Sequence, residues 1–124
     1  MNIERINGEF SVCKVREFDP EYLRNKFCFL AVTDRENSLV CPTEIVPEKT
    51  LQREDGWRLY RIQGQLEFSL IGILAKISRV LARAGVPIFA ISTFDTDYIM
   101  IKNTDEFSAV KRLEENGYNI ALSE

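Results

Sequence analysis

Histidine is absent from the 124-residue sequence, and this absence removes whole classes of chemistry. Neither a Ser-His-Asp triad nor a Cys-His pair can be assembled, and the commonest transition-metal ligand is missing. The three cysteines, at positions 13, 28 and 41, are odd in number and form no Cys-x-x-Cys motif. We therefore expect reduced thiols rather than a disulfide scaffold, with no metal site and no cofactor.

Long apolar runs are also missing. No stretch approaches the ~20 residues that a membrane-spanning helix needs, and the first residues, Met1 to Arg5, lack a basic region followed by an apolar segment. The formal net charge is −3, so the chain has no overall attraction for phosphate backbones. We expect a cytoplasmic protein that binds neither membranes nor nucleic acid.

What the sequence contains is the composition of a folded domain, with 45% hydrophobic and 28% charged residues. A charged connection at 52–56 separates an N-terminal half, 1–55, from a C-terminal half, 57–124. A half of this size gains little stability alone, so we expect the sheet of the first half to rest on the second.

The C-terminal half alternates strand and helix patterns. Apolar residues at spacings of three and four predict an amphipathic helix over 70–84, with Ser69 as its cap and Gly85 at its end. The predicted elements are a strand at 57–62, that helix, strands at 87–92 and 98–102, a helix starting near Thr104 and a strand at 118–122. This β-α-β-β-α-β order is that of the ferredoxin-like α+β fold.

The N-terminal half has a weaker pattern. Strands are expected at 9–15, 27–32 and 38–41, and a short helical turn at 42–46. Asp19 is placed to cap another short helix that has Pro20 at its first position. The half has the form of a shrunken copy of the same unit, although no direct similarity between the halves is visible.

Two segments carry chemistry that fits a small ligand. The helix that follows 65–72 offers unpaired backbone N–H groups to a carboxylate, and Gly72 allows a close approach; the alternative is local packing. The connection 92–97 holds two carboxylates, of which Asp97 can pair with an ammonium group; the alternative is a solvated turn. Asp95 and Asp97 are two positions apart on a solvated turn, a spacing that does not predict a catalytic acid–base pair.

Three runs together resemble a known family: Phe68 to Leu74, Leu81 to Ile88 and Ile91 to Ile99. They are similar to the ACT domains of aspartate kinases, and more so to small bacterial tandem-ACT proteins and the animal cytosolic arginine sensors. The Ser-Thr-Phe-x-x-Asp string at 92–97 is the most specific part. In the N-terminal half, 29–33 and 38–42 resemble the truncated first ACT module of those proteins.

The resemblance implies two ACT modules, the first truncated, with antiparallel sheets side by side and an amino acid bound at the seam between modules. The α-carboxylate of the bound amino acid would contact one set of residues, and its ammonium group or side chain would contact a second set. Carried onto this sequence, the first set is Ser69, Leu70, Ile71 and Gly72, and the second is Thr93, Phe94 and Asp97.

These features predict a non-catalytic amino-acid-binding regulatory protein that forms a homo-oligomer and acts on a protein partner. The acidic residues Glu67, Asp95 and Asp97 favour Lys or Arg as the ligand. The main alternative is a ligand-free ACT-type module for protein–protein interaction. An RNA-binding module shares the element order but needs aromatic and basic strand residues that 88–91 and 98–102 do not carry. A small ferredoxin-like enzyme would need a polar site that we cannot assemble.

Overall fold

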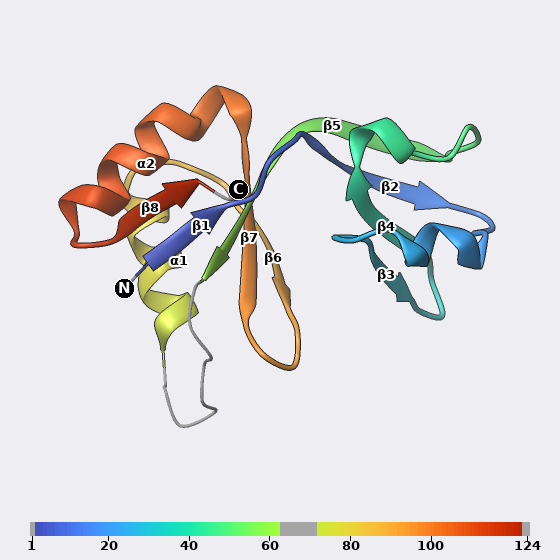
Figure 1. Ribbon diagram of the computed structural model, residues 1–124, viewed down its shortest axis with the longest axis horizontal. Coiled ribbons are helices and arrows are strands. Elements are labelled where there is room, and N and C mark those ends of the chain that lie inside the picture. Colours follow the sequence, from blue (N-terminus) through green and yellow to red (C-terminus); the bar gives the residue numbers. More distant parts are fainter. Residues whose placement is uncertain (1, 63–71, 123–124) are drawn as a thin grey trace. The chain divides into compact units, whose positions relative to one another are not determined.

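The computed structural model describes residues 2–62 and 72–122. The chain forms two compact units (Figure 1). One, called here the short unit, is Gly8–Gly56; the other, the helical unit, combines Met1–Asn7 with Trp57–Glu124. The sequence analysis placed the first seven residues in the N-terminal half, whereas the structure groups them with the C-terminal half.

The helical unit contains both α-helices. Strand β5 begins in the short unit and belongs to the helical unit from Trp57 onward. The elements are β1 (Asn2–Arg5), β5 (Gln52–Ile62), α1 (Ile73–Arg83), β6 (Phe89–Ser92), β7 (Asp97–Lys102), the 3-10 turn η3 (Asn103–Asp105), α2 (Glu106–Glu115) and β8 (Asn119–Leu122). From β5 onward this is the β-α-β-β-α-β order of the ferredoxin-like α+β fold. None of the described helices is long and apolar enough to cross a membrane.

The sheet of the helical unit has the order β6-β7-β5-β1-β8. Strand β1 lies between β5 and β8, antiparallel to the first and parallel to the second. The sequence analysis predicted no strand here, because Asn2 to Arg5 contains a single apolar residue. That residue, Ile3, is completely buried and pairs with Ile62 on one side and Ile120 on the other.

Both helices lie on one side of this sheet (Figure 1). The apolar spacing predicted their buried faces: Ile77 and Leu81 of α1 and Ala109 and Leu113 of α2 are completely buried. Burial of one large aliphatic side chain contributes about 1.5–3 kcal/mol. The rest of this core is formed by Ile3, Tyr60, Ile62, Val86, Ile99 and Ile101.

Helix α1 begins later than the sequence predicts. Its N-cap is Gly72, whose φ of +81° lies in the left-handed region, so the described helix starts at Ile73. The predicted cap Ser69 lies outside the described residues. The end is as predicted: Gly85 has φ +74°, and the N–H groups of Gly85 and Val86 donate to the carbonyls of Ala82 and Leu81.

The short unit contains four paired strands and no α-helix. Its elements are β2 (Phe10–Val15), the 3-10 turn η1 (Pro20–Arg24), β3 (Phe29–Val32), β4 (Asn37–Pro42), the 3-10 turn η2 (Thr43–Ile45) and the start of β5. The strand order is β3-β4-β2-β5. The side chain of Asp19 accepts from the N–H of Glu21 at 2.9 Å, which confirms its predicted capping role.

Three free cysteines contribute to the core of the short unit. Cys13 and Cys41 are buried with Val15 and Leu39. Cys28, the residue before β3, packs against this cluster. Burial of the thiol raises the pKa of Cys28, so this cysteine stays protonated at neutral pH. The thiols act here as small apolar side chains.

The hairpins β3–β4 and β6–β7 have the same construction. Phe29 pairs with Val40 and Phe89 with Met100, so a constant shift of 60 residues relates the two ladders. Each turn starts at a threonine: the N–H of Thr33 donates to Glu36 O at 2.9 Å, and the corresponding bond joins Thr93 to Thr96 O at 2.8 Å. The similarity was not visible in the sequence, because the hairpins share few residue identities.

Candidate ligand-binding site

The turn between β6 and β7 gathers most of the predicted polar residues. Ser92 and Asp97 are cross-strand partners, and the Ser92 hydroxyl donates to Asp97 Oδ1 at 2.5 Å. The hydroxyl of Thr93 donates to the carbonyl of Thr96 at 3.0 Å and accepts from its N–H at 3.4 Å. These bonds fix the turn locally, so the Asp97 carboxylate is held in one place.

Thr96 ties this turn to another strand. Its hydroxyl donates to the carbonyl oxygen of Ile62 at 2.6 Å. Ile62 is the last residue of β5, from which the chain runs through residues 63–71 to α1. The sequence analysis named Thr96 only as part of a polar connection, because a contact across 34 positions has no local signature.

Phe94 is 82% exposed at the tip of the turn. This exposure leaves most of the ring accessible from solvent. Asp95, next to it, is exposed as well.

Among the described residues, no side chain caps the start of α1. Gly72 offers no hydroxyl or carboxylate, and the first turn of the helix contains no acidic residue. The first N–H groups of a helix carry partial positive charge, so this end suits an anion from outside the helix. A Cβ at Gly72 would meet no described atom within 4 Å. The positive φ, rather than a close approach, explains this glycine.

The structure brings three of the seven predicted site residues together. Thr93, Phe94 and Asp97 lie in or beside one turn, and Gly72 is the N-cap of α1. In Figure 1 the end of β5, the start of α1 and the β6–β7 turn lie at the same end of the helical unit. The remaining predicted residues, Ser69, Leu70 and Ile71, lie outside the described residues.

A cation is fixed beside this turn. Arg61 of β5 forms an ion pair with Glu4 at 2.6 Å and lies over the ring of Tyr98 at 6.0 Å from its centroid. Hydrogen bonds to Tyr98 and, second, to Glu4 raise the pKa of Arg61 above its ordinary value. Tyr98 follows Asp97 directly, so the arginine stiffens the strand that carries the candidate carboxylate.

A second polar cluster anchors α2 to the sheet. The hydroxyl of buried Tyr60 donates to Glu106 at the start of α2, and Arg5 Nε donates to the same carboxylate at 2.6 Å. Burial, followed by the bond to Glu106, raises the pKa of Tyr60 well above its usual value. Burial opposes ionisation of Glu106, but the hydrogen bonds from Arg5 and Tyr60 lower its pKa overall.

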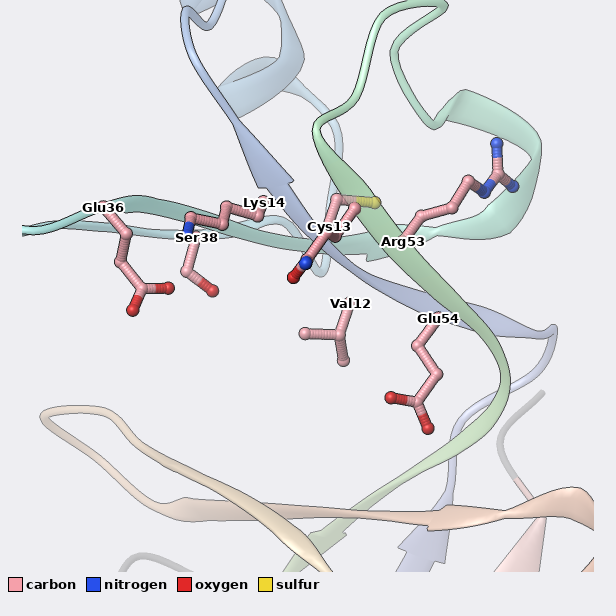
Figure 2. Close-up of a pocket in the computed structure, with 8 residues that line it drawn as sticks. Val12, Cys13, Lys14, Glu36, Ser38, Arg53 and Glu54 are labelled. Atoms are coloured by element: carbon pink, nitrogen blue, oxygen red, sulfur yellow. The ribbon is translucent and has the colours of Figure 1, made fainter.

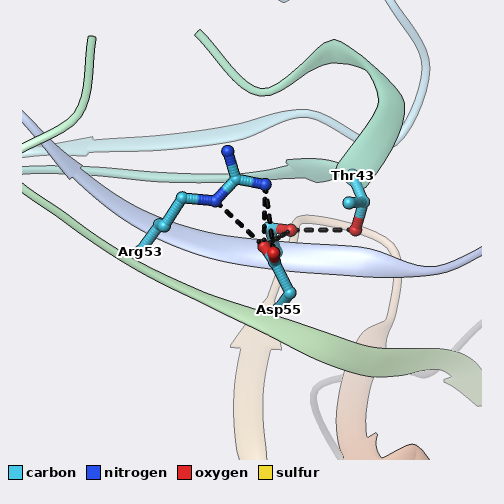
Figure 3. Close-up of polar contacts among 4 residues, drawn as sticks. Thr43, Arg53 and Asp55 are labelled. Carbon is cyan, nitrogen blue, oxygen red and sulfur yellow. Dashed lines mark hydrogen bonds and ion pairs between the residues drawn. The ribbon is translucent and has the colours of Figure 1, made fainter. Parts of the chain in front are cut away.

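The short unit has its own polar cluster (Figure 3). Completely buried Ser11 donates to Asp55 Oδ1 at 2.5 Å and shares a 2.8 Å hydrogen bond with Thr43. Arg53 Nη2 donates to both oxygens of Asp55, at 3.0 and 3.1 Å. The cluster joins β2, η2 and β5. In the ranges 2–62 and 72–122, no group of Cys, Asp and Glu side chains is arranged to hold a metal ion.

Comparison with solved structures supports the fold. A crystal structure of the Agrobacterium tumefaciens protein Atu0741 matches with a TM-score of 0.88 and 25% identity, over 99% of this chain and 93% of that one. Aspartate kinase from Synechocystis matches with a TM-score of 0.68 and 16% identity, over 99% of this chain and 28% of the kinase. The ligand-free regulatory subunit of aspartate kinase from Thermus thermophilus matches with a TM-score of 0.56 and 10% identity. The match covers 88% of this chain and 91% of the subunit.

The sequence profile of the ACT domain matches residues 52–115, which extend from the start of β5 to the end of α2. This range includes the β6–β7 turn and the start of α1, the two parts of the candidate site. It also agrees with the resemblance to the regulatory modules of aspartate kinases. The chain therefore belongs to the ACT domain family, whose members are regulatory modules.

Proposed function

We propose that this protein is a non-catalytic regulator that binds an amino acid at the end of the helical unit where α1 starts. The observation that carries the proposal is the β6–β7 turn, in which Ser92 holds the Asp97 carboxylate and Thr96 ties the turn to Ile62. This fixed carboxylate and the uncapped start of α1 present opposite charges, as an amino-acid zwitterion requires.

Each charge has a defined role in the proposal. The α-carboxylate binds the backbone N–H groups of Ser69, Leu70, Ile71 and Gly72, which precede the first residue of α1, Ile73. The ammonium group binds Asp97, the hydroxyl of Thr93 contributes a hydrogen bond, and exposed Phe94 covers the apolar part of the ligand. The further acidic residue Asp95 in the turn favours Lys or Arg as the ligand.

The short unit serves in this proposal as a truncated first ACT module. Its elements follow the order β2-η1-β3-β4-η2-β5, in which 3-10 turns stand where an ACT domain has helices. The 60-residue correspondence of the two hairpins supports a common origin of the units. We propose that the ligand lies at a seam between modules and that a second copy of the chain completes it, which makes the protein a homo-oligomer.

The regulated activity belongs to another chain in this proposal. The protein spans 28% of the Synechocystis aspartate kinase, but it spans 91% of the Thermus regulatory subunit. We propose that the regulator acts on a separate protein partner. The free cysteines support the cytoplasm as its location.

A thermal-shift screen of the full chain against the twenty amino acids tests the proposal. A ligand at 100 times its Kd adds about 2.7 kcal/mol to the free energy of unfolding. Asp97→Asn should abolish the shift, whereas Asp95→Asn, a matched change in the same turn, should only weaken it. The absence of a shift with every amino acid at millimolar concentration would overturn the proposal.

A ligand-free interaction module is the second candidate. The exposed apolar side chains Phe94, Phe107 and Leu122, which are 69–84% accessible, favour it. It predicts an oligomer whose mass and melting temperature do not respond to any amino acid. A monomeric sedimentation coefficient at micromolar concentration would exclude it.

A further inference from the structure

A pocket of about 250 Å³ lies in the short unit, where β2 ends beside the turn between β3 and β4. The end of β2 contributes Lys14 and the following Arg16, and the turn contributes Arg35 and Glu36. Figure 2 shows two of these side chains, with Lys14 extending from its strand in the direction of Glu36. The pocket therefore collects charged groups from two segments that are about 20 positions apart in the sequence.

The backbone around this pocket is held by side-chain hydrogen bonds. The hydroxyl of Thr33 accepts from the N–H groups of Arg35 and Glu36, each at 3.1 Å. The side-chain amide of Asn37 donates to the carbonyl of Arg16 at 3.0 Å, so it connects the turn side of the pocket to the end of β2. These bonds fix the segments from which the charged side chains project.

The pocket holds more positive than negative charge. Lys14, Arg16 and Arg35 are three cations, and Glu36 supplies the one carboxylate among the described lining residues; Asp34 of the same turn does not line the pocket. Within residues 2–62 and 72–122, none of the three cations forms an ion pair or a side-chain hydrogen bond. Such a group of cations attracts an anion, and each arginine can bind a carboxylate through two parallel hydrogen bonds.

The neighbouring surface adds charges of both signs in equal number. A recess of about 320 Å³, which shares Arg16 with the pocket, is also lined by Lys49 and Glu17. The groove drawn in Figure 2 is bordered in addition by Arg53 and Glu54. These neighbours leave the positive excess of the pocket unchanged.

The turn of this pocket is the counterpart of the turn in the candidate site. The shift of 60 residues that relates the two hairpins places Arg35 at the position of Asp95 and Asn37 at the position of Asp97. Two carboxylates of the helical unit are thus replaced by a cation and by an amide that is bonded to Arg16. The turn of the short unit cannot hold an ammonium group as proposed for Asp97, and it suits a ligand of the opposite charge.

We propose that this pocket is a second ligand site, which takes an acidic amino acid, a small molecule with two carboxylates and one ammonium group. The two carboxylates bind Lys14, Arg16 and Arg35, and the ammonium group binds Glu36. The volume suits a ligand of amino-acid size, since the sites of larger, drug-sized ligands usually occupy about 300–1,000 Å³.

The pocket and the proposed function depend on different side chains, so they can be tested separately. Isothermal titration calorimetry of the full chain carrying Asp97→Asn isolates the pocket. L-glutamate should bind saturably, and L-glutamine, in which an amide replaces one carboxylate, at least tenfold more weakly. Arg16→Gln and Arg35→Gln should each weaken glutamate binding at least tenfold. Lys26→Gln, an exposed change in the same unit outside the pocket, should leave it unchanged.

Glutarate, which has both carboxylates but lacks the ammonium group, tests the role of Glu36. The chain should bind L-glutamate at least threefold more tightly than glutarate, and Glu36→Gln should remove this preference. A preference that persists in Glu36→Gln would overturn the assignment of the ammonium group to this carboxylate.

The pattern across variants separates the two sites. Glutamate binding that survives Asp97→Asn but is lost with Arg16→Gln and Arg35→Gln supports the pocket. Glutamate binding that both arginine variants retain, or none up to millimolar concentration, overturns the pocket while the proposed function stands. Displacement of glutamate by an equal concentration of inorganic phosphate would also overturn it, because any anion would then suffice. Both arginines are exposed, so unchanged melting temperatures should accompany their substitution.

Discussion

Tyr60 and Glu106 are 46 positions apart in the sequence, and the hydroxyl of the first donates a hydrogen bond to the carboxylate of the second. Tyr60 is completely buried in β5, and Glu106 is the first residue of α2. The bond therefore connects the sheet to the start of the helix, and Arg5 of β1 completes the connection from a third element.

Tyr60→Phe removes this hydroxyl and keeps the ring. We expect a loss of about 1–3 kcal/mol in the free energy of unfolding, because a partly buried carboxylate loses one hydrogen bond but keeps Arg5. Urea denaturation measures this loss. Tyr98→Phe, a tyrosine without a bond to Glu106, should cost less; equal losses for both would contradict the role of Tyr60.

The Glu106 cluster also predicts a dependence on pH. Although burial opposes ionisation of Glu106, hydrogen bonds from Arg5 and Tyr60 lower its pKa below the value in the unfolded chain, about 4.3. Its stabilising contribution is therefore fully present above that pH and is lost as the pH falls through the folded pKa. At pH 7 the free energy of unfolding of the wild type should exceed that of Glu106→Gln by about 1.5–3 kcal/mol. The difference should narrow below about pH 4; a constant difference down to pH 3 would contradict this assignment.

Thr96→Val keeps the shape of the side chain but removes the hydroxyl bond to Ile62. We expect a loss of about 0.5–1.5 kcal/mol in stability and a weaker response to the amino-acid ligand, since the turn loses its tie to β5. Thr96→Ser, which keeps the hydroxyl, should restore most of the ligand response in the thermal-shift assay. If the valine and serine variants show the same thermal shift with the ligand, the hydrogen bond from residue 96 to Ile62 does not position the site.

Gly72→Ala tests the left-handed backbone at the start of α1. The added Cβ meets no described atom, so the cost arises from the φ of +81° and should be about 1–2 kcal/mol. Gly72→Asn should cost less, because asparagine tolerates this conformation better. The ratio of the two losses, measured by thermal denaturation, checks the account; a larger loss for Asn would point to a steric cause.

Much of the helical unit could be predicted because its signals are local. The spacing of Ile77 and Leu81 predicted the buried face of α1, and Gly85 predicted its end. Strand β1 could not be predicted, because Ile3 is its single apolar residue and its partners, Ile62 and Ile120, are distant in the sequence. The short unit was harder to predict, because its 3-10 turns are too short to show periodicity.

The candidate site was predictable in part. Its residue types were visible in 92–97, since hydroxyl and carboxylate side chains stand out in a short connection. The pairing of Ser92 with Asp97 follows from the register of two strands, and the bond of Thr96 to Ile62 from their packing. Neither relation is contained in local sequence, so the sequence predicted the chemistry of the site but not its arrangement.

Chemical-shift mapping of the ¹⁵N-labelled full chain with L-arginine or L-lysine tests the central claim most directly. If the amino acid binds at the proposed site, the backbone signals of Gly72 and Ile73 and of Thr93 to Asp97 shift together along one saturable curve, and Asp97→Asn removes these shifts. Spectra that do not change at either segment with any amino acid, up to millimolar concentration, would contradict an amino-acid site between the β6–β7 turn and the start of α1.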